Sequence, residues 1–305
     1  MKGIIVALPN DENLAKELGK KGTANGINFF NRKAGDTTIT VLTPSDIKEK
    51  YYAVAQSIML ANVVVLSSKS IDALFGEVVI ASALLNKRIL VTKEGDARKV
   101  LGEANADYEV VPREELLASI SNIAAQQKPD SAASNGFKRI EIDKAFPVNG
   151  VGDVALGVVV SGSVAKHDVL LHNSGVQVTV RSVQMQDEDV EVAEEGARVG
   201  LALKGLSYEE IEKGDVLSSK QIKPQRKLLA DISLSKFIKD DKIEGRWQLI
   251  RDFSAVNATI TAESGKFAVS LEKAVPFEKG DRFLLVRGSV PRIAASGIVS
   301  SITDQ

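Results

Sequence analysis

The first 126 residues alternate short apolar runs with segments whose apolar positions recur at helical spacing. Five apolar runs predict strands, at Gly3–Leu8, Thr37–Leu42, Val63–Leu66, Arg88–Val91 and Tyr108–Val111. Helices are predicted between them, from Asn10 as N-cap to Gly19, and at Ile47–Leu60, Asp72–Leu85 and Glu114–Ala125. One run, Val63–Leu66, is apolar throughout, which is typical of a central parallel strand buried on both faces. Residues 1–126 are therefore expected to form an α/β domain around a mostly parallel sheet.

The pattern changes after residues 127–136, whose small, polar and proline residues have nothing to bury and predict a linker. The next region, 137–221, has β-branched runs at Phe137–Ile142, Ala155–Val160, Val176–Val183 and Val199–Leu203. A short helical insert is expected there at Ser207–Glu212. The last region, 222–305, has runs at Lys227–Leu234, Arg246–Ile250, Ser254–Ala262, Lys266–Leu271, Phe283–Val286 and Ile293–Val299. Short strands separated by Gly and Asp turns predict an all-β barrel in each of these two regions.

The composition is that of an ordinary globular chain, since 44% of the 305 residues are hydrophobic and 26% are charged. The absence of cysteine excludes disulfides, cysteine-ligated zinc and iron–sulfur clusters. No apolar run approaches the roughly 20 residues that span a bilayer, and Met1 to Ile4 lead directly into a strand. We therefore expect no membrane segment, no signal peptide and a cytoplasmic protein.

The net charge of −1 is unevenly distributed along the chain. Basic and acidic residues are equal in number over 1–136, whereas 137–221 contain 9 basic and 14 acidic residues. Residues 222–305 contain 14 basic and 10 acidic residues, an excess that is also common in domains that bind no nucleic acid. If any part of the chain meets phosphate groups, this C-terminal third is the better candidate.

The middle of the chain carries a pattern that is specific to one family. The stretch Phe146–Gly162 contains a Phe, a Gly-x-Gly, a Gly-x-Val and a final Gly turn, and it resembles the opening of domain 2 in elongation factor Tu. Two later segments, Glu194–Gly200 and Gly205–Leu217, are similar to the same domain in order and spacing.

The flanking regions resemble the selenocysteine-specific branch of this family more loosely. The segments Leu271–Pro276 and Glu278–Arg282 are similar to its third domain. The segment Lys20–Thr23 and the dipeptide Thr43-Pro44 are similar to the G domain of its archaeal members. The resemblance implies a paralogue of translational GTPases, with a degenerate P-loop GTPase-like domain followed by domain 2-like and domain 3-like barrels.

The segment after the first strand lacks the phosphate-binding loop of such GTPases. A P-loop reads Gly-x-x-x-x-Gly-Lys-Ser/Thr, so that backbone amides and a lysine surround the phosphates. Here Pro9–Leu14 contains neither glycine nor lysine. In addition, Asp11 and Glu12 place negative charge at the helix N-terminus, where a phosphate would bind.

Other positions of the nucleotide pocket also depart from the family pattern. The family reads Asp-Thr-Pro-Gly where this chain has Leu42 for the magnesium-supporting aspartate, Thr43-Pro44, and Ser45 for the glycine. The resemblance further implies that Asn28 replaces the switch I threonine and that Asp46 replaces the water-orienting histidine. In the base-reading Asn-Lys-x-Asp, it implies that Thr92 replaces the asparagine and that the aspartate is displaced to Asp96. These concurrent losses predict no catalytic residue, no metal and no cofactor. The degenerate pocket is expected near Asn10, Asp11, Asn28, Leu42, Thr43, Ser45 and Lys93.

Three further patterns have plain structural interpretations. The segment Gly150–Ala155 matches a dinucleotide fingerprint superficially, but a strand follows it where a helix is required. The only histidines, His167 and His172, are predicted to be surface turn residues rather than a metal pair. The acidic run Glu188–Glu195 predicts a solvated barrel loop.

Basic and aromatic residues come together between Arg246 and Phe253 in the basic third domain. We predict Arg246 and Arg251 as candidate phosphate contacts for RNA, and Trp247 as a core residue. The family resemblance implies that the barrels engage tRNA or the ribosome, and that other translation factors are further partners. Three alternatives remain: an α/β domain that was never a GTPase, an active GTPase with a diverged pocket, and a protein-interaction module that regulates translation factors.

Overall fold

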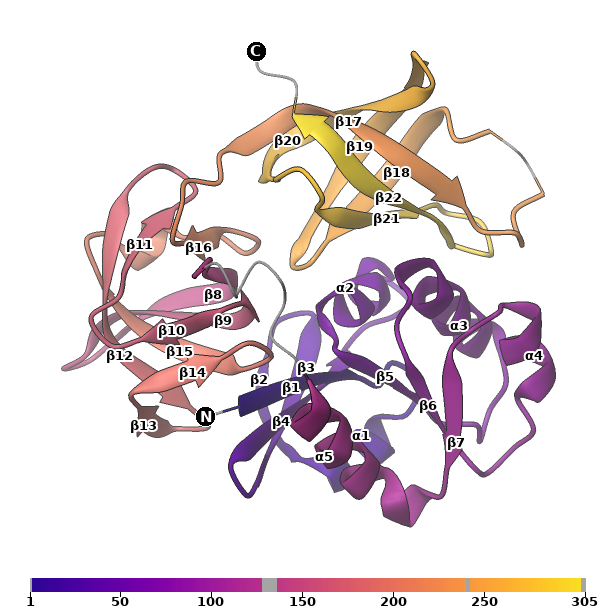
Figure 1. Cartoon of the computed structure of the whole chain (residues 1–305), viewed down its shortest axis with the longest axis horizontal. Helices are drawn as coiled ribbons and strands as arrows, with labels where there is room; N and C mark the ends of the chain where they lie inside the picture. The colour runs from indigo at the N-terminus through magenta and orange to yellow at the C-terminus, as the bar shows by residue number, and fades with distance from the viewer. Residues whose placement is uncertain (1, 128–135, 240–241, 303–305) are drawn as a thin grey trace.

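A computed structural model describes residues 2–127, 136–239 and 242–302 of the chain. Its strands fall into three groups along the sequence, one within an α/β layer and two within barrels (Figure 1). This arrangement confirms the predicted fold class. The predicted linker, 127–136, lies almost entirely outside the described residues.

The first group is a seven-stranded sheet in the order β2-β3-β4-β1-β5-β6-β7. Five strands are parallel: β1 (Lys2–Ala7), β4 (Thr37–Pro44), β5 (Val63–Leu66), β6 (Ile89–Thr92) and β7 (Tyr108–Val111). Two antiparallel strands, β2 (Lys20–Ala24) and β3 (Ile27–Ala34), extend the sheet at the β4 edge. The sequence pattern missed these two, because β2 is exposed along its whole length and β3 is buried only in its first half.

Helices cover both faces of this sheet. One face packs against α1 (Glu12–Leu18) and α5 (Leu116–Gln126), and the other against α2 (Tyr52–Leu60) and α3 (Ala73–Leu85). The short helix α4 (Arg98–Glu103) was not predicted. The predicted cap of the first helix was wrong by one residue, because Asp11, not Asn10, accepts the hydrogen bond from Leu14 N–H at 2.9 Å. No helix in the described ranges is long and apolar enough to cross a membrane.

The second group closes into a six-stranded barrel, because β11 pairs with both β12 and β16. Its strands are β8 (Arg139–Val148), β9 (Gly152–Ser161), β11 (Val169–His172), β12 (Gln177–Met185), β15 (Arg198–Lys204) and β16 (Val216–Ser218). Three short strands accompany the barrel, β10 (Ser163–Ala165), β13 (Glu188–Val190) and β14 (Val192–Glu194). The predicted insert is a single 3₁₀ turn, Tyr208–Glu210, which begins with a capping box at Ser207.

The third group is a closed barrel in the order β17-β20-β19-β18-β21-β22. Its strands are β17 (Pro224–Leu234), β18 (Gly245–Arg251), β19 (Ser254–Glu263), β20 (Lys266–Pro276), β21 (Arg282–Val286) and β22 (Ile293–Ile302). This barrel lies over α2 and α3 (Figure 1). Its residues Ile250, Phe253, Leu284, Val286 and Ile293 belong to the same apolar cluster as the two helices. The cluster therefore continues from the α/β layer into the third barrel.

Candidate functional site

The carboxyl edge of the parallel strands is where open α/β sheets bind ligands. Here the residues that follow β1 and β5 bind each other. The Asn10 amide nitrogen donates to Ser67 O at 2.7 Å, and Ser67 N–H donates to the Asn10 side-chain oxygen at 3.1 Å. Both hydrogen-bonding groups of the Asn10 amide are thus directed at a neighbouring loop of the protein.

A carboxylate occupies the start of α1, directly after Asn10. Burial raises the pKa of Asp11, but hydrogen bonds from Leu14 N–H and Ser67 and the cations Lys69 and Arg113 together hold this pKa below its ordinary value. The side chain is therefore ionised at neutral pH. Its hydrogen bond to the helix N-terminus uses the amide that an anion would require.

A second carboxylate, Glu94, lies at the end of β6 in the same polar cluster. It accepts hydrogen bonds from Thr92 Oγ1 at 2.7 Å, Ser67 Oγ at 3.2 Å and Arg113 Nη1 at 3.0 Å. Burial raises the pKa of Glu94, but these hydroxyls and the cations Lys69 and Arg113 outweigh burial and lower it. The edge of the sheet thus presents two ionised carboxylates, each paired with groups of the protein.

The remaining predicted pocket residues lie on or beside β3 and β4. Asn28 and Thr43 are opposite each other across these strands, and both are buried. Leu42 is fully buried in the apolar cluster with α2, so its side chain contributes to packing. Ser45 donates its N–H to Gly26 O at 3.1 Å. Lys93 is exposed in the turn after β6.

The β2–β3 hairpin, which corresponds to the predicted switch I position, is attached to the middle barrel. The Asn25 side chain donates to Asp143 O at 3.2 Å, and Lys213 Nζ donates to Asn25 O at 2.9 Å. The Arg198 guanidinium stacks 3.6 Å from the centre of the Phe29 ring and donates to Asp143 at 2.7 Å. The hairpin is therefore held to the middle barrel by hydrogen bonds and by a cation–aromatic contact.

Helices α2 and α3 are attached to the third barrel by buried polar contacts as well as by apolar packing. Gln56 on α2 donates to Phe253 O at 2.6 Å. Glu77 on α3, 2% exposed, accepts from the backbone N–H groups of Arg292 at 2.6 Å and Ile293 at 2.8 Å. The Arg292 guanidinium also lies 4.4 Å from the centre of the Tyr51 ring.

A buried ionic network joins the middle and third barrels. Glu141, fully buried, accepts from Arg139 Nε at 2.8 Å and from Arg251 at 2.6 and 3.1 Å. Asp281 accepts two further hydrogen bonds from Arg139, at 2.8 and 2.9 Å. Burial lowers the pKa of Arg139, but the Glu141 and Asp281 carboxylates more than reverse this effect, so it stays charged.

The network corrects one of the two predicted RNA contacts. Arg251 is 1% exposed and its guanidinium is engaged by Glu141, so an external phosphate has no access to it. Arg251 shares a strand face with the core residues Trp247 and Leu249, because alternate residues of a strand point to the same side. This alternation of strand faces could be read from the sequence. Arg246 lies on the opposite face of the strand and is exposed.

Arg246 ends a row of four exposed residues that crosses the third barrel. It pairs with Thr259, which pairs with Ser270, which pairs with Lys227. Three strand spacings of about 4.8 Å place the two cations roughly 14 Å apart. Two hydroxyls lie between them, so the row is a polar, cationic strip without an acidic member.

The other sequence candidates have structural roles. The glycines of Gly150–Ala155 lie in a turn and at the start of β9, as predicted. His167 is exposed as expected, but His172 is 3% exposed, so the surface prediction was wrong for it. Its Nδ1 lies 2.8 Å from Ser174 Oγ and its Nε2 3.1 Å from Asp215, and Ser174 N–H also donates to Nδ1. His172 therefore closes the turn between β11 and β12.

Comparison with known proteins identifies the class of the molecule. Residues 152–218 match the family model of elongation factor Tu domain 2. The structure is similar to the translation elongation factor SelB of Methanococcus maripaludis bound to a GTP analogue, with a TM-score of 0.78 at 20% identity. That similarity covers 99% of this chain and 80% of the SelB chain. The chain therefore has the three-part fold of elongation factors of the SelB type.

Sequence relatives make the assignment more specific. The chain is 30% identical over 300 residues to the uncharacterized protein MJ0325 of Methanocaldococcus jannaschii, covering 95% of this chain and 96% of that protein. It belongs to the same family as MJ0325. The elongation factor 1-alpha of Methanobrevibacter smithii is 33% identical over 102 residues, which is 33% of this chain and 24% of that factor. The similarity in sequence to the elongation factors thus covers about a third of the chain.

Proposed function

We propose that this protein is an elongation-factor-like binding protein that engages tRNA or the ribosome without binding or hydrolysing GTP. The observation that carries the proposal is the carboxyl edge of the sheet, where Asn10, Asp11 and Glu94 are paired with groups of the protein itself. A triphosphate there would meet two ionised carboxylates in place of backbone amides and a lysine.

The attachment of the β2–β3 hairpin and of α2 to the two barrels supports the same proposal. In GTPases, switch loops are ordered by the γ-phosphate and Mg²⁺ and released on hydrolysis. Here the β2–β3 hairpin is bound to the middle barrel through Asn25 and Lys213, and α2 is bound to the third barrel through Gln56. These contacts need no nucleotide, so the expected activity is binding by a permanently assembled three-part body.

Membership of the middle barrel in the elongation factor Tu domain 2 family supports RNA or ribosome binding. The basic balance of residues 222–305 and the exposed row from Arg246 to Lys227 add a surface for phosphate groups. Phosphate contacts fix position without reading sequence, so this surface suits the backbone of a folded RNA.

We expect GTP and GDP to leave the thermal midpoint unchanged. A ligand present at 100 times its dissociation constant stabilises the native state by about 2.7 kcal/mol, a shift of several degrees. Differential scanning fluorimetry with about 1 mM GTP or GDP and Mg²⁺, and ATP as the control nucleotide, is the measurement. A shift of several degrees with GTP or GDP but not ATP would show that the pocket works and that the proposal is wrong.

We expect Arg246→Ala to weaken tRNA binding about 3–10-fold, because one phosphate contact is lost, and to reduce the slope of log affinity against log salt by about one. Filter binding with total tRNA from about 50 to 200 mM salt measures both quantities. The matched control is Lys99→Ala, an exposed cation on α4, which should change neither. If the unmodified protein ignores tRNA and ribosomes at low salt, the protein-interaction interpretation is favoured.

A further inference from the structure

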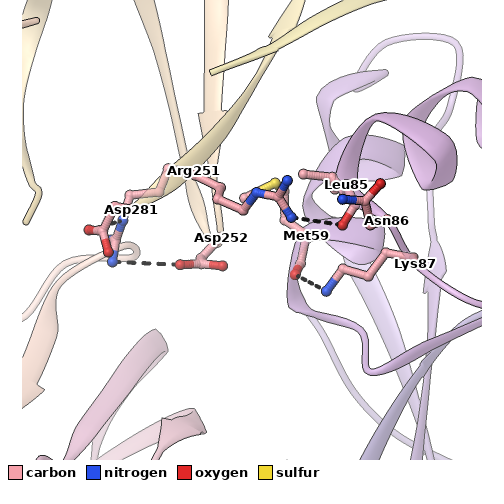
Figure 2. Close-up of a pocket in the computed structure, with 8 residues that line it drawn as sticks. Met59, Leu85, Asn86, Lys87, Arg251, Asp252 and Asp281 are labelled. Carbon is pink, nitrogen blue, oxygen red and sulfur yellow. Dashed lines mark hydrogen bonds and ion pairs between the residues drawn. The ribbon is translucent and has the colours of Figure 1, made fainter. Parts of the chain in front are cut away.

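A cavity of about 330 Å³ lies where the α/β layer meets the third barrel (Figure 2). It is lined by Met59, Leu85, Asn86, Lys87, Arg251, Asp252, Asp281 and Arg282. A second cavity of about 180 Å³ shares Met59, Lys87 and Asp252 with the first and continues toward the middle barrel at Val158–Val160. The first cavity is within the size range of small-ligand sites.

Two cations on opposite sides of the domain junction are held in place at this cavity. Lys87 Nζ donates to Met59 O at 3.2 Å and to Ala61 O at 2.5 Å, which leaves one of its three N–H groups unassigned. Arg282 Nη1 donates to Leu85 O at 2.9 Å, which leaves four of its five N–H groups. The backbone carbonyls fix both side chains without neutralising them.

The acidic residues do not balance these cations equally. Asp281 is fully engaged by Arg139 and the backbone of the 278–281 turn, and it lies 3.4 Å from Arg251 Nε. Arg251 is engaged by Glu141. Within the described part of the chain, Asp252 accepts no hydrogen bond, and its one ion pair is at 3.6 Å from Arg251 Nη2. Asp252 has a backbone φ of 47° and lines both cavities (Figure 2).

We propose that this cavity is a binding site for a small anion with a phosphate or carboxylate group, held between Lys87 of the α/β layer and Arg282 of the third barrel. Three basic and two acidic side chains line the cavity, and the hydrogen bonds of Lys87 and Arg282 go to uncharged backbone carbonyls. Burial strengthens such contacts, because charged hydrogen bonds gain energy when water is excluded. A bound anion would also tie two parts of the molecule together.

The protonation states of two residues at the site make the affinity for an anion depend on pH. Burial raises the pKa of Asp252 to about 6, with Asp281 adding to the rise and Arg139 opposing it. Burial lowers the pKa of Lys87 to about 8, with Arg282 adding to the fall and Asp252 opposing it. As pH falls from 9 to 5, Lys87 gains its charge and Asp252 then loses its charge. The charged groups that face this pair are Arg139, Arg251, Asp281, Arg282 and Glu195.

Isothermal titration calorimetry on the full chain tests the proposal, with inorganic phosphate and with succinate at constant ionic strength. We expect a dissociation constant of about 1 mM or tighter for at least one of them, and tighter binding at pH 6 than at pH 8.5. The stronger of the two probes distinguishes phosphate chemistry from carboxylate chemistry. Absence of heat with both anions at about 10 mM, at either pH, would refute the site.

Three substitutions and one control locate the binding. Arg282→Gln and Lys87→Met should each weaken binding of the anion at least tenfold, whereas Lys99→Met, at an exposed lysine of the same layer, should not. Asp252→Asn should tighten binding of the anion about threefold or more at pH 7.5, since it removes the opposing negative charge. This variant also tests the site if Lys87→Met does not fold. Unchanged affinity in Arg282→Gln and Asp252→Asn would place the anion elsewhere and overturn the proposal.

Discussion

Replacing Glu141 with alanine should lower the free energy of unfolding by about 3–5 kcal/mol, the largest effect that we expect from a single substitution in this protein. Among the residues that the structure describes, Glu141 is the one carboxylate that accepts hydrogen bonds from both Arg139 and Arg251. Its removal leaves Arg251, 1% exposed, without its main counter-ion. The expected loss of stability is therefore the free energy of burying an unpaired charge, which is larger than the modest net stabilisation that an ion pair provides.

Urea unfolding followed by tryptophan fluorescence is the measurement, because Trp247 is the only tryptophan of the chain and is buried on β18, the strand that also carries Arg251. The matched control is Arg246→Ala on the same strand, which removes an exposed cation and should change the free energy of unfolding by less than about 0.5 kcal/mol. Equal effects of Glu141→Ala and Arg246→Ala would mean that the network contributes nothing to stability.

The second prediction concerns the attachment of α3 to the third barrel. Glu77→Ala should destabilise the protein by about 2–4 kcal/mol, because two buried backbone N–H groups, of Arg292 and Ile293, lose their acceptor. Hydrogen exchange of these two amides should accelerate at least tenfold, which reports local detachment as well as global stability.

Glu77→Gln is the informative companion to the alanine variant. The glutamine keeps one side-chain oxygen as an acceptor, so we expect roughly half of the alanine effect and protection of one of the two amides. Glu103→Ala, an exposed acid on α4, serves as the charge control and should leave both amides protected. Fast hydrogen exchange of the Arg292 and Ile293 amides in the unmodified protein would show that Glu77 does not hold α3 against the third barrel.

These two contacts bear on function because they cross between parts of the molecule that move relative to one another in switching proteins. The Glu141 network joins the two barrels, and the Glu77 contact joins α3 to the third barrel. Both are buried, and both would have to break if the parts separated. The proposed binding protein, which stays assembled, is consistent with these contacts.

Local pattern was sufficient to predict the three-part architecture. The alternation of apolar strands and helices over 1–126, and the short β-branched runs that follow, reflect periodicities that a helix or strand imposes on its own residues. The predicted strands Val63–Leu66 and Tyr108–Val111 have the observed bounds. Strands β2 and β3 escaped prediction because β2 is an exposed edge strand and the burial of β3 is confined to its first half.

The sequence by itself determined that Pro9–Leu14 contains neither glycine nor lysine and that position 42 is a leucine, because these are statements of residue identity. Only the tertiary structure decided which groups these residues contact. The pairing of Asn10 with Ser67 spans 57 residues, and that of Arg251 with Glu141 spans 110. Residues so far apart in the sequence meet only because of how the α/β layer and the barrels pack. No local sequence pattern predicts such pairs. The same packing placed Lys87 and Asp252 around one cavity.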